Sequence, residues 1–230
     1  MNKGEREAHL KEQLDAMLAY ERVLWDGGVL FIGGVDEVGR GPLAGPVCAA
    51  CAVLPRDFSV LGVNDSKKLS EKKRNELYGQ IIEQAFAYGI GLISPARIDE
   101  VNILNATKEA MLIAIGDANR MLAERNAGTD TIEHLLVDAV KLPEAGIPGT
   151  AIVKGDEKSV SIAAASIVAK VTRDRIMMEF ENVYPGYGFA KNKGYGTAEH
   201  YAGIEALGIT PIHRHSFCHE LEPCRTDFER

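Results

Sequence analysis

Four carboxylates occupy places where a protein chain rarely keeps acids without a reason. Each lies inside or soon after an apolar run that predicts a buried β-strand: Asp36, Glu37, Asp138 and Asp156. If the three strands belong to one sheet, the acids converge, and like charges so close together stay ionised only with a cation to hold them. Oxygen ligands without an accompanying His or Cys select a hard ion, Mg²⁺ or Mn²⁺.

Such acids favour a metal-dependent nuclease, because two ions bridged by a carboxylate such as Asp36 support in-line displacement at a phosphodiester. A simpler interpretation is open for each acid. Asp156 precedes a helix that starts near Ser159, so it could be a cap or a turn residue. Neighbouring strand residues point to opposite faces, so Asp36 and Glu37 reach one ion only if a bulge intervenes or Glu37 contributes its main-chain carbonyl.

Basic and aromatic residues gather locally near these acids and suggest a polyanionic ligand. The basic residues are Lys67, Lys68, Lys72, Lys73 and Arg74, followed by Lys154, Lys158 and Lys170 around Asp156. Taken singly, each is typical of a solvated surface. The stretch Gly39-Arg40-Gly41 permits close backbone approach to a ligand, although a tight turn also uses glycine. Tyr184, Tyr187 and Tyr195 alternate with Lys191 and Lys193, as expected where a sugar or base stacks, or where tyrosines merely pack.

The cysteines and the late histidines are weaker candidates for chemistry. Cys48 and Cys51 lie in an apolar run that reads as a strand, where their spacing puts the thiols on opposite faces, so we expect core residues and no zinc site. The segment from His213 to His219, with Cys218, is a minor metal candidate beside a surface or packing role.

Composition limits the possible classes of protein. The chain has 230 residues, 46% of them hydrophobic and 26% charged, which is typical of a globular protein with a full core. Its net charge of -7 disfavours a partner held by bulk charge alone, so a nucleic-acid ligand needs a locally basic face. No apolar run reaches 18 residues, and residues 1–26 carry charges throughout, so we expect neither a membrane span nor a secretory signal, and a cytoplasmic location.

The elements that must position these residues can be read from periodicity and stop signals. We expect one helix before the Gly27-Gly28 break and a hairpin over 29–54 that turns through the glycine-rich segment 39–45. Further strands are predicted at 85–93, 134–137 and 151–153, and helices at 71–84, 103–125, 159–183 and 198–207, with 126–128 ending the second of these helices. Hairpin strands followed by alternating strands and helices favour an α/β fold with a mixed sheet and helices on its faces.

With these residues assembled, the chain closely resembles the prokaryotic type 2 ribonuclease H family, ribonuclease HII. The segments that carry the resemblance are 35–46, 65–69, 137–139, 154–156, 161–170, 193–197 and 213–217. The resemblance implies an RNase H-like mixed sheet flanked by helices, a C-terminal helical part and a short N-terminal helical extension. It divides the chain into an extension over 1–28, a catalytic domain over 29–217 and a tail over 218–230.

The resemblance also implies roles for individual residues. Asp36, Glu37, Asp138 and Asp156 would be catalytic ligands of two divalent ions, Mg²⁺ or Mn²⁺. Gly39, Arg40 and Gly41 would sense the ribose 2′-hydroxyl, Tyr195 would stack on the next sugar, and Lys67, Ser166 and Lys170 would hold phosphates. The implied substrates are RNA/DNA hybrids and duplex DNA containing ribonucleotides, which would be cut to 3′-hydroxyl and 5′-phosphate ends. We expect the protein to be a monomer.

Two departures from the family and two rival functions follow from the same residues. His215 stands where the family often has a second Arg, so one positive charge near the substrate becomes pH-dependent. The N-terminal helix is an extension that many members lack, and it is too short for the larger N-terminal domain of ribonuclease HIII, while Tyr195 favours type HII. The rivals are an RNase H-like nuclease acting on DNA and a noncatalytic hybrid-binding module.

Overall fold

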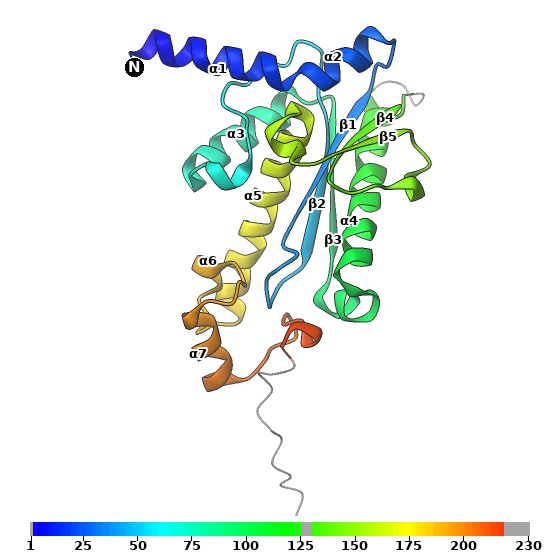
Figure 1. The fold of residues 1–230 in the computed structure, drawn as a ribbon. Coiled ribbons are helices and arrows are strands. Elements are labelled where there is room, and N and C mark those ends of the chain that lie inside the picture. The colour runs from blue at the N-terminus through cyan, green and yellow to red at the C-terminus, as the bar shows by residue number, and fades with distance from the viewer. Residues whose placement is uncertain (1, 126–129, 219–230) are drawn as a thin grey trace, which may run out of the picture.

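A five-stranded mixed sheet forms the centre of the molecule in the computed structural model, which describes residues 2–125 and 130–218 (Figure 1). The strands are β1 (Ile32–Val38), β2 (Val47–Val53), β3 (Ala87–Ile93), β4 (His134–Asp138) and β5 (Gly149–Ile152), in the order β3-β2-β1-β4-β5. The first three pair antiparallel, whereas β4 runs parallel to β1 and β5 parallel to β4. The predicted mixed sheet and its leading hairpin are confirmed.

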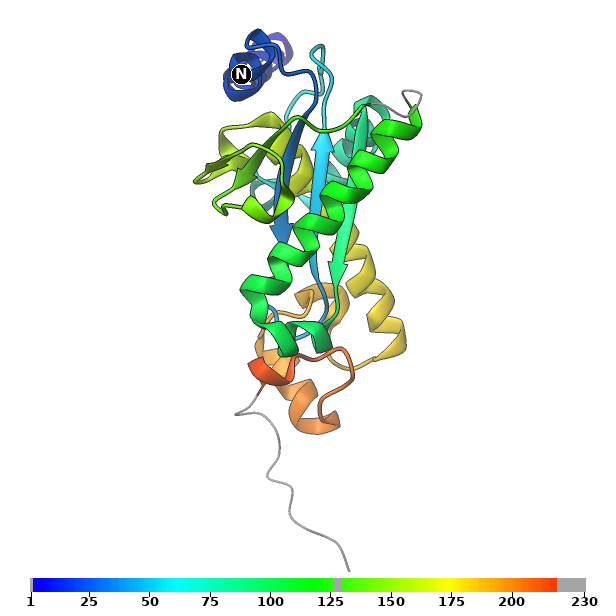
Figure 2. The same cartoon turned by 90° about the vertical axis from the view of Figure 1, so that its right-hand side faces the viewer.

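Helices cover both faces of the sheet, α4 (Pro95–Arg125) on one and α5 (Val160–Val183) on the other (Figure 2). The predicted close packing of the Ala-rich start of α5 is confirmed at Gly34 of β1. A Cβ built there would lie 2.1 Å from the carbonyl carbon of Ser161, so only glycine admits this helix. The helix that carries Ser166 and Lys170 is therefore fixed directly against the strand that carries Asp36.

The cysteine prediction is confirmed. Cys48 belongs to the apolar cluster under α5, and Cys51 belongs to the cluster under α4, on the opposite face of β2. Burial raises the pKa of each thiol to about 12, so both stay neutral and act as small apolar side chains.

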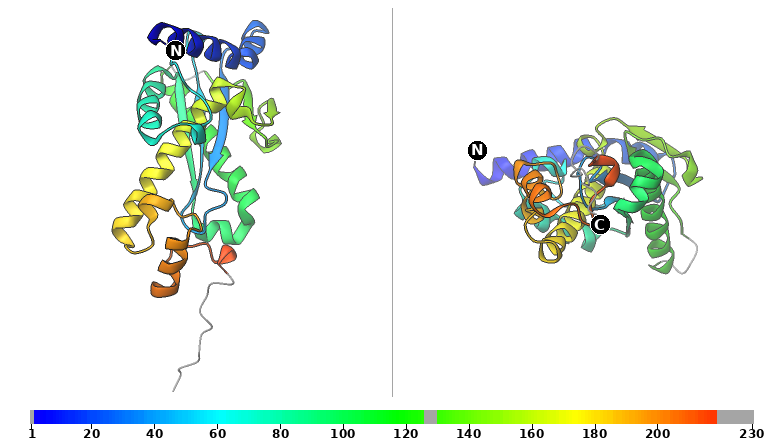
Figure 3. Two further views of the ribbon diagram at one scale, coloured as in Figure 1. Left: turned by 60° about the vertical axis from the view of Figure 1, so that its left-hand side comes forward. Right: turned by 90° about the horizontal axis from the view of Figure 1, so that it is seen from below.

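The N-terminal extension differs from the single predicted helix. It consists of α1 (Lys3–Met17) and α2 (Ala19–Asp26), which meet at Leu18 and lie across the end of the molecule opposite α7 (Ala198–Leu207) (Figure 3). The change of direction at Leu18 allows Met17, Leu18 and Trp25 all to reach the core, which one straight helix does not achieve. The predicted stop is confirmed, since α2 ends at Asp26.

Glu21 of α2 joins this extension to α5. Its buried carboxylate accepts hydrogen bonds from the Ser159 hydroxyl (2.5 Å) and from the Ser161 amide (3.0 Å), at the first turn of α5. Burial raises the pKa of Glu21 in spite of these bonds. The extension therefore caps the helix that follows Asp156.

Two other boundaries differ from the prediction. Helix α4 starts at Pro95, eight residues early, and breaks at Asn102, whose φ is 67° and whose side chain caps Leu104 and Asn105. The predicted helix, which starts at residue 103, corresponds to the segment of α4 after this break. Its predicted stop over 126–128 lies outside the described residues. Strand β5 ends at Ile152, which is the last residue paired with β4. Val153, the predicted end of this strand, is exposed.

The N-caps of α3 (Glu71–Gln84), α5 and α7 are Ser70, Ser159 and Thr197, each of which accepts a first-turn amide through its side chain. A short helix, α6 (Phe189–Asn192), was not predicted. It packs with α7 and the end of α5 around Tyr187 and Phe189, and this C-terminal helical part lies at the end of the sheet where β1 terminates. In the part of the chain that the structure describes, no helix is long and apolar enough to span a bilayer.

Candidate active site

All four candidate acids come to one end of β1 and β4. Asp36 and Glu37 are near the end of β1, and Asp138 ends β4, where the parallel register places it beside them. Asp156 follows β5 in a single 3₁₀ turn (Gly155–Glu157), directly before α5. Asp138 lies close enough to the other three for its charge to raise the pKa of each.

The pKa shifts of these acids have a common first cause, which is burial. Burial and then the charge of Glu37 raise the pKa of Asp36 well above its ordinary value. Burial also raises the pKa of Glu37, against the lowering effect of Arg40, and that of Asp156, with Asp65 as the next contributor. Without a counter-ion, each of these three carboxyl groups therefore resists ionisation. A bound cation would stabilise their ionised forms.

Hydrogen bonds hold the carboxylates of Asp36 and Asp138 in fixed orientations. Asp36 accepts from the Glu37 amide (2.7 Å) and interacts with the Ser166 hydroxyl of α5, and Asp138 accepts from the Gly155 amide (2.7 Å). The ladder between β1 and β2 runs without interruption through Asp36 and Glu37, so the bulge considered from the sequence is not present. The Glu37 side chain pairs with Arg40 and lies close enough to Asp36 for its charge to raise the pKa of Asp36.

The site fits divalent ions by three observations. Glu37 Oε2 is buried and has no hydrogen-bond partner among the described residues, although its Oε1 pairs with Arg40 (3.3 Å). The donors are all carboxylate oxygens, and the pKa values of Asp36, Glu37 and Asp156 are raised. Within residues 2–125 and 130–218, no group of three or more His, Cys, Asp or Glu side chains is arranged to hold a metal ion by itself, so waters or substrate phosphate oxygens would have to complete the coordination.

The glycine segment after β1 lies next to Tyr195. Gly41 is open on its outer side, where the nearest atom to a methyl group added at its Cα would be Tyr195 Cε1 at 3.8 Å. Gly39 has a φ of +90°, and a Cβ there would lie 2.2 Å from Nε of Arg173, so no other residue fits. The structure therefore brings Gly39, Arg40, Gly41 and the half-exposed Tyr195 ring together.

The predicted phosphate-holding residues lie beside the acids, on the short helix Ser66–Lys68 and on α5. Burial lowers the pKa of Lys67, but Asp156 and the other acids outweigh it, so the pKa is raised and the ammonium stays charged. The hydroxyl of Ser166 hydrogen bonds to that of Ser66 (2.9 Å). Lys170 already pairs with Asp174 (2.7 Å), so its charge is partly neutralised within the protein.

Several residues of this region were not singled out as site residues from the sequence. Asp65 is buried, accepts from the Lys67 amide (2.9 Å) and raises the pKa of Asp156. It stands in one of the segments that carry the family resemblance, which was a usable signal. Arg173 and Arg214 are fully buried behind the glycine segment. Arg214 stands in the segment 213–217 that carries the resemblance, whereas nothing in the local sequence distinguishes Arg173 from a surface arginine.

The late histidine cluster is not a metal centre within the described residues. His213 accepts from the Thr210 amide at Nδ1 (2.9 Å), and its Nε2 faces Nε2 of His200 (3.1 Å). Because Nδ1 of His213 is an acceptor, its Nε2 donates to His200, which in turn donates from Nδ1 to the Tyr195 carbonyl (3.0 Å). Both rings are thus neutral and connect the C-terminal segment to the Tyr195 loop. His219 lies outside the described residues.

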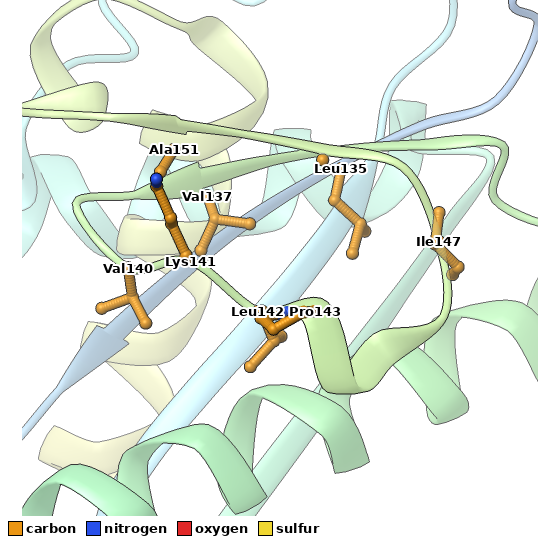
Figure 4. Close-up of a pocket in the computed structure, with 9 residues that line it drawn as sticks. Leu135, Val137, Val140, Lys141, Leu142, Pro143, Ile147 and Ala151 are labelled. Atoms are coloured by element: carbon orange, nitrogen blue, oxygen red, sulfur yellow. The ribbon is translucent and has the colours of Figure 1, made fainter.

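An apolar pocket of about 410 Å³ lies beside β4, β5 and the loop that connects them (Figure 4). Leu135, Val137 and Ala151 of the strands line it, together with Val140, Leu142 and Pro143 of the connecting loop. None of the four acids lines this pocket, so the chemistry belongs to the open region between the strand ends, the glycine segment and α5.

A mixed sheet with carboxylates at the adjoining ends of β1 and β4 and a third acidic position before the long helix defines an RNase H-like nuclease. The family model described as Ribonuclease HII matches residues 33–220. The chain belongs to the ribonuclease HII family and is a metal-dependent endoribonuclease.

Individual relatives agree. Ribonuclease HII of Bacillus anthracis (strain CDC 684 / NRRL 3495) is 54% identical over 207 residues, which cover 90% of this chain and 76% of that protein. Ribonuclease HII of Clostridioides difficile (strain 630) is also 54% identical, with 90% and 77% covered. The solved structure of ribonuclease H2 from Pyrococcus horikoshii OT3 superposes with a TM-score of 0.69 at 28% identity, covering 84% of this chain and 97% of that one. Bst-RNase HIII in complex with Mn²⁺ shares the fold, with a TM-score of 0.58 at 21% identity over 82% of this chain and 67% of its own.

Proposed function

We propose that this endoribonuclease cuts the RNA strand of RNA/DNA hybrids and also cuts on the 5′ side of single ribonucleotides embedded in duplex DNA. The products are a 3′-hydroxyl and a 5′-phosphate. The observation that carries the proposal is the convergence of four buried or half-buried carboxylates, one with an unpartnered oxygen, beside a glycine segment that a nucleotide sugar can approach closely.

Asp36, Glu37, Asp138 and Asp156 would hold two divalent ions, Mg²⁺ or Mn²⁺. When bound, such ions activate a water and stabilise the charge on the leaving oxygen. The unpartnered Glu37 Oε2 and the raised pKa values support this assignment, as does the Mn²⁺ in the Bst-RNase HIII structure. The protein's own contribution is orientation: Ser166 and the Glu37 amide fix Asp36, and the Gly155 amide fixes Asp138.

Lys67, Ser166 and Lys170 would hold the phosphates that flank the cut. Lys67 is exposed and remains charged beside the acids, so it can approach a phosphate already close to the ions. Lys170 has to share its ammonium between Asp174 and the incoming phosphate. The Ser66–Ser166 hydrogen bond joins the Lys67 turn to α5, so these donors keep a fixed spacing.

Selection of RNA over DNA would come from Gly39, Arg40, Gly41 and Tyr195, since phosphate contacts do not distinguish the two backbones. Main-chain groups at the glycines can reach the 2′-hydroxyl, and the exposed Tyr195 ring beside Gly41 can stack on the following sugar, where a deoxyribose packs best. A ribonucleotide followed by DNA therefore fits both contacts.

One assay separates this proposal from its rivals. DNA duplexes with one, four or no ribonucleotides are incubated with the enzyme in Mg²⁺, Mn²⁺ or chelator, and the products are mapped on a gel. We expect cutting 5′ of the ribonucleotides with either metal and none in chelator. Cutting of the all-DNA duplex would favour an RNase H-like DNA nuclease. Binding without any cutting would favour a noncatalytic module, which massed carboxylates facing phosphates already disfavour.

The division into 1–28, 29–217 and 218–230, a monomeric state and a cytoplasmic location remain proposals from the sequence. The end of α2 at Asp26 supports the first boundary. Size-exclusion chromatography with light scattering tests the monomer.

A further inference from the structure

Two arginines are fully buried directly behind the glycine segment, and both donate to main-chain carbonyl oxygens. Arg214 donates to the carbonyls of Gly39 (2.6 Å), Arg40 (2.9 Å) and Gly45 (2.8 Å from Nη2 and 3.0 Å from Nε). Arg173, on α5, donates to the carbonyls of Pro46 (2.9 Å) and Ala44 (3.1 Å). Five of the carbonyls between residues 39 and 46 are thus turned toward two guanidinium groups.

Burying two guanidinium groups in this way costs free energy, so a contribution to stability alone does not explain it. Among the described residues, neither guanidinium has a carboxylate within ion-pair distance, and both have zero exposure. Burial lowers the pKa of Arg214 to about 9, which leaves the group charged at neutral pH. A buried cation costs several kcal/mol unless its bonds compensate, and an apolar core would hold a loop at lower cost. The two charges therefore point to a role in the shape and polarity of the segment.

The direction of the carbonyls fixes the direction of the amides. A trans peptide is planar, and its C=O and N–H point in opposite directions; the described residues contain no cis peptide. Since the carbonyls of Gly39 and Arg40 face Arg214, the amides of Arg40 and Gly41 in the same peptide units face away from it. Successive outward amides form a concave donor surface that suits an oxygen or an anion.

We propose that Arg173 and Arg214 are positioning residues for substrate reading, which hold residues 39–46 from behind so that the amides of Arg40 and Gly41, rather than the carbonyls of Gly39 and Arg40, face the ribonucleotide. This inference rests on the proposed function of the glycine segment. The 2′-hydroxyl then acts as an acceptor toward this loop, and the two buried cations add an attractive potential for the neighbouring phosphate.

The same arginines join the loop to Tyr195. Arg173 also donates to the Lys193 carbonyl (2.9 Å), and the amides of Leu43 and Ala44 both donate to the Gly194 carbonyl (2.8 and 3.3 Å). From the other side, the Arg214 amide donates to the Leu43 carbonyl (2.8 Å). The glycine loop and the Tyr195 loop are thereby held at one spacing, as reading two consecutive sugars requires.

Arg173→Lys and Arg214→Lys test the proposal, because lysine keeps the charge but cannot span several carbonyls with a fixed fork. The matched control is Arg125→Lys: Arg125 donates to the carbonyls of Ala85 (2.9 Å) and Phe86 (2.8 Å), away from the site. The readouts are kcat and KM on a duplex with one ribonucleotide, the melting temperature, and hydrogen exchange of residues 39–46.

In each lysine variant we expect kcat to fall roughly 10- to 100-fold with KM within about threefold, because phosphate contacts remain while the reading loop moves. Exchange in 39–46 should rise roughly tenfold, and α4 should not change. Arg125→Lys should stay within about twofold of wild type in kcat. In Arg214→Ala, added guanidinium ion at a sub-denaturing concentration should restore part of the rate.

The proposal is overturned if a folded lysine variant keeps wild-type kcat, or if its loop exchange is unchanged. If the variants do not fold, wild-type exchange decides: amides of 43–45 that exchange as fast as the Ile147 amide in the loop between β4 and β5 would overturn it, and strong protection would support it. Failure of the proposed function is seen separately, as wild-type enzyme that cuts no ribonucleotide-containing duplex while the loop remains protected.

Discussion

Replacing Asp138 by Asn removes one charge from the centre of the acidic cluster with little change in shape. The Asn side-chain oxygen can still accept the Gly155 amide bond that Asp138 accepts now. Asp138 contributes to the raised pKa of Asp36, Glu37 and Asp156, so the substitution relieves repulsion at all three positions. Its effects on activity and on stability should therefore have opposite signs.

The expected loss of activity is roughly 100- to 1,000-fold or more in kcat, the size seen when one electrostatic group at a transition state is removed. The metal-free variant should be more stable than wild type by about 1–2 kcal/mol, since each pKa unit of repulsion relieved is worth about 1.4 kcal/mol. For a chain of this size, that raises the melting temperature by about 3–6 °C.

The pH dependence has a definite sign. Acids whose pKa is raised on folding stabilise the protein below their unfolded pKa of about 4, and this contribution is lost as pH rises through the folded pKa. In chelator, the cluster should therefore lower the stability of wild type between about pH 4 and neutrality, and the slope should be smaller in Asp138→Asn. Saturating Mn²⁺ should stabilise wild type more than the variant.

The assay combines thermal unfolding in chelator and in Mn²⁺ with cleavage of a duplex containing four ribonucleotides. Asp117→Asn is the matched control, because Asp117 pairs with Arg120 on the same helix, α4, and lies outside the site. Near-normal turnover of Asp138→Asn in saturating Mg²⁺ would refute the assignment of Asp138. A variant less stable than wild type in chelator would refute the repulsion argument.

Three further outcomes are expected. Deleting residues 1–25 should lower the melting temperature but leave cleavage of a short chimeric substrate at high enzyme concentration, because the extension supplies none of the acids; a folded but inactive truncation contradicts this. Tyr195→Ala should lower cleavage activity about 5- to 150-fold on a single embedded ribonucleotide, since stacking is worth about 1–3 kcal/mol. The loss of activity on a long hybrid should be smaller. Equal losses measured on both substrates would remove Tyr195 as the junction sensor. Burial lowers the pKa of His213 to about 4, so the contribution of this neutral ring to stability should be lost as pH falls from about 6.5 toward 4. At about pH 6, ¹⁵N NMR should find the His213 ring neutral. A charged ring at that pH would contradict the hydrogen-bond direction given above.

Residues whose role depends on neighbours a few positions away were predictable. Ser70, Ser159 and Thr197 cap helices because each hydroxyl reaches an amide three residues ahead. The strands that carry Asp36 and Asp138 follow from their apolar runs, and acids within such runs are conspicuous. The sheet class followed from the order of these elements, and the family resemblance added roles that periodicity alone does not contain.

What only the tertiary structure decided involves partners far apart in the chain. The break at Leu18 exists because α2 must turn its Glu21 toward Ser159, 138 residues away, and the ion pair of Lys170 depends on packing that no spacing rule fixes. No local pattern in the sequence shows that Arg214 is buried, yet it lies against Gly39, 175 residues earlier. Local sequence determines backbone preference and amphipathic pattern, whereas the burial of a charge is decided by whichever distant carbonyls the folded chain brings to it.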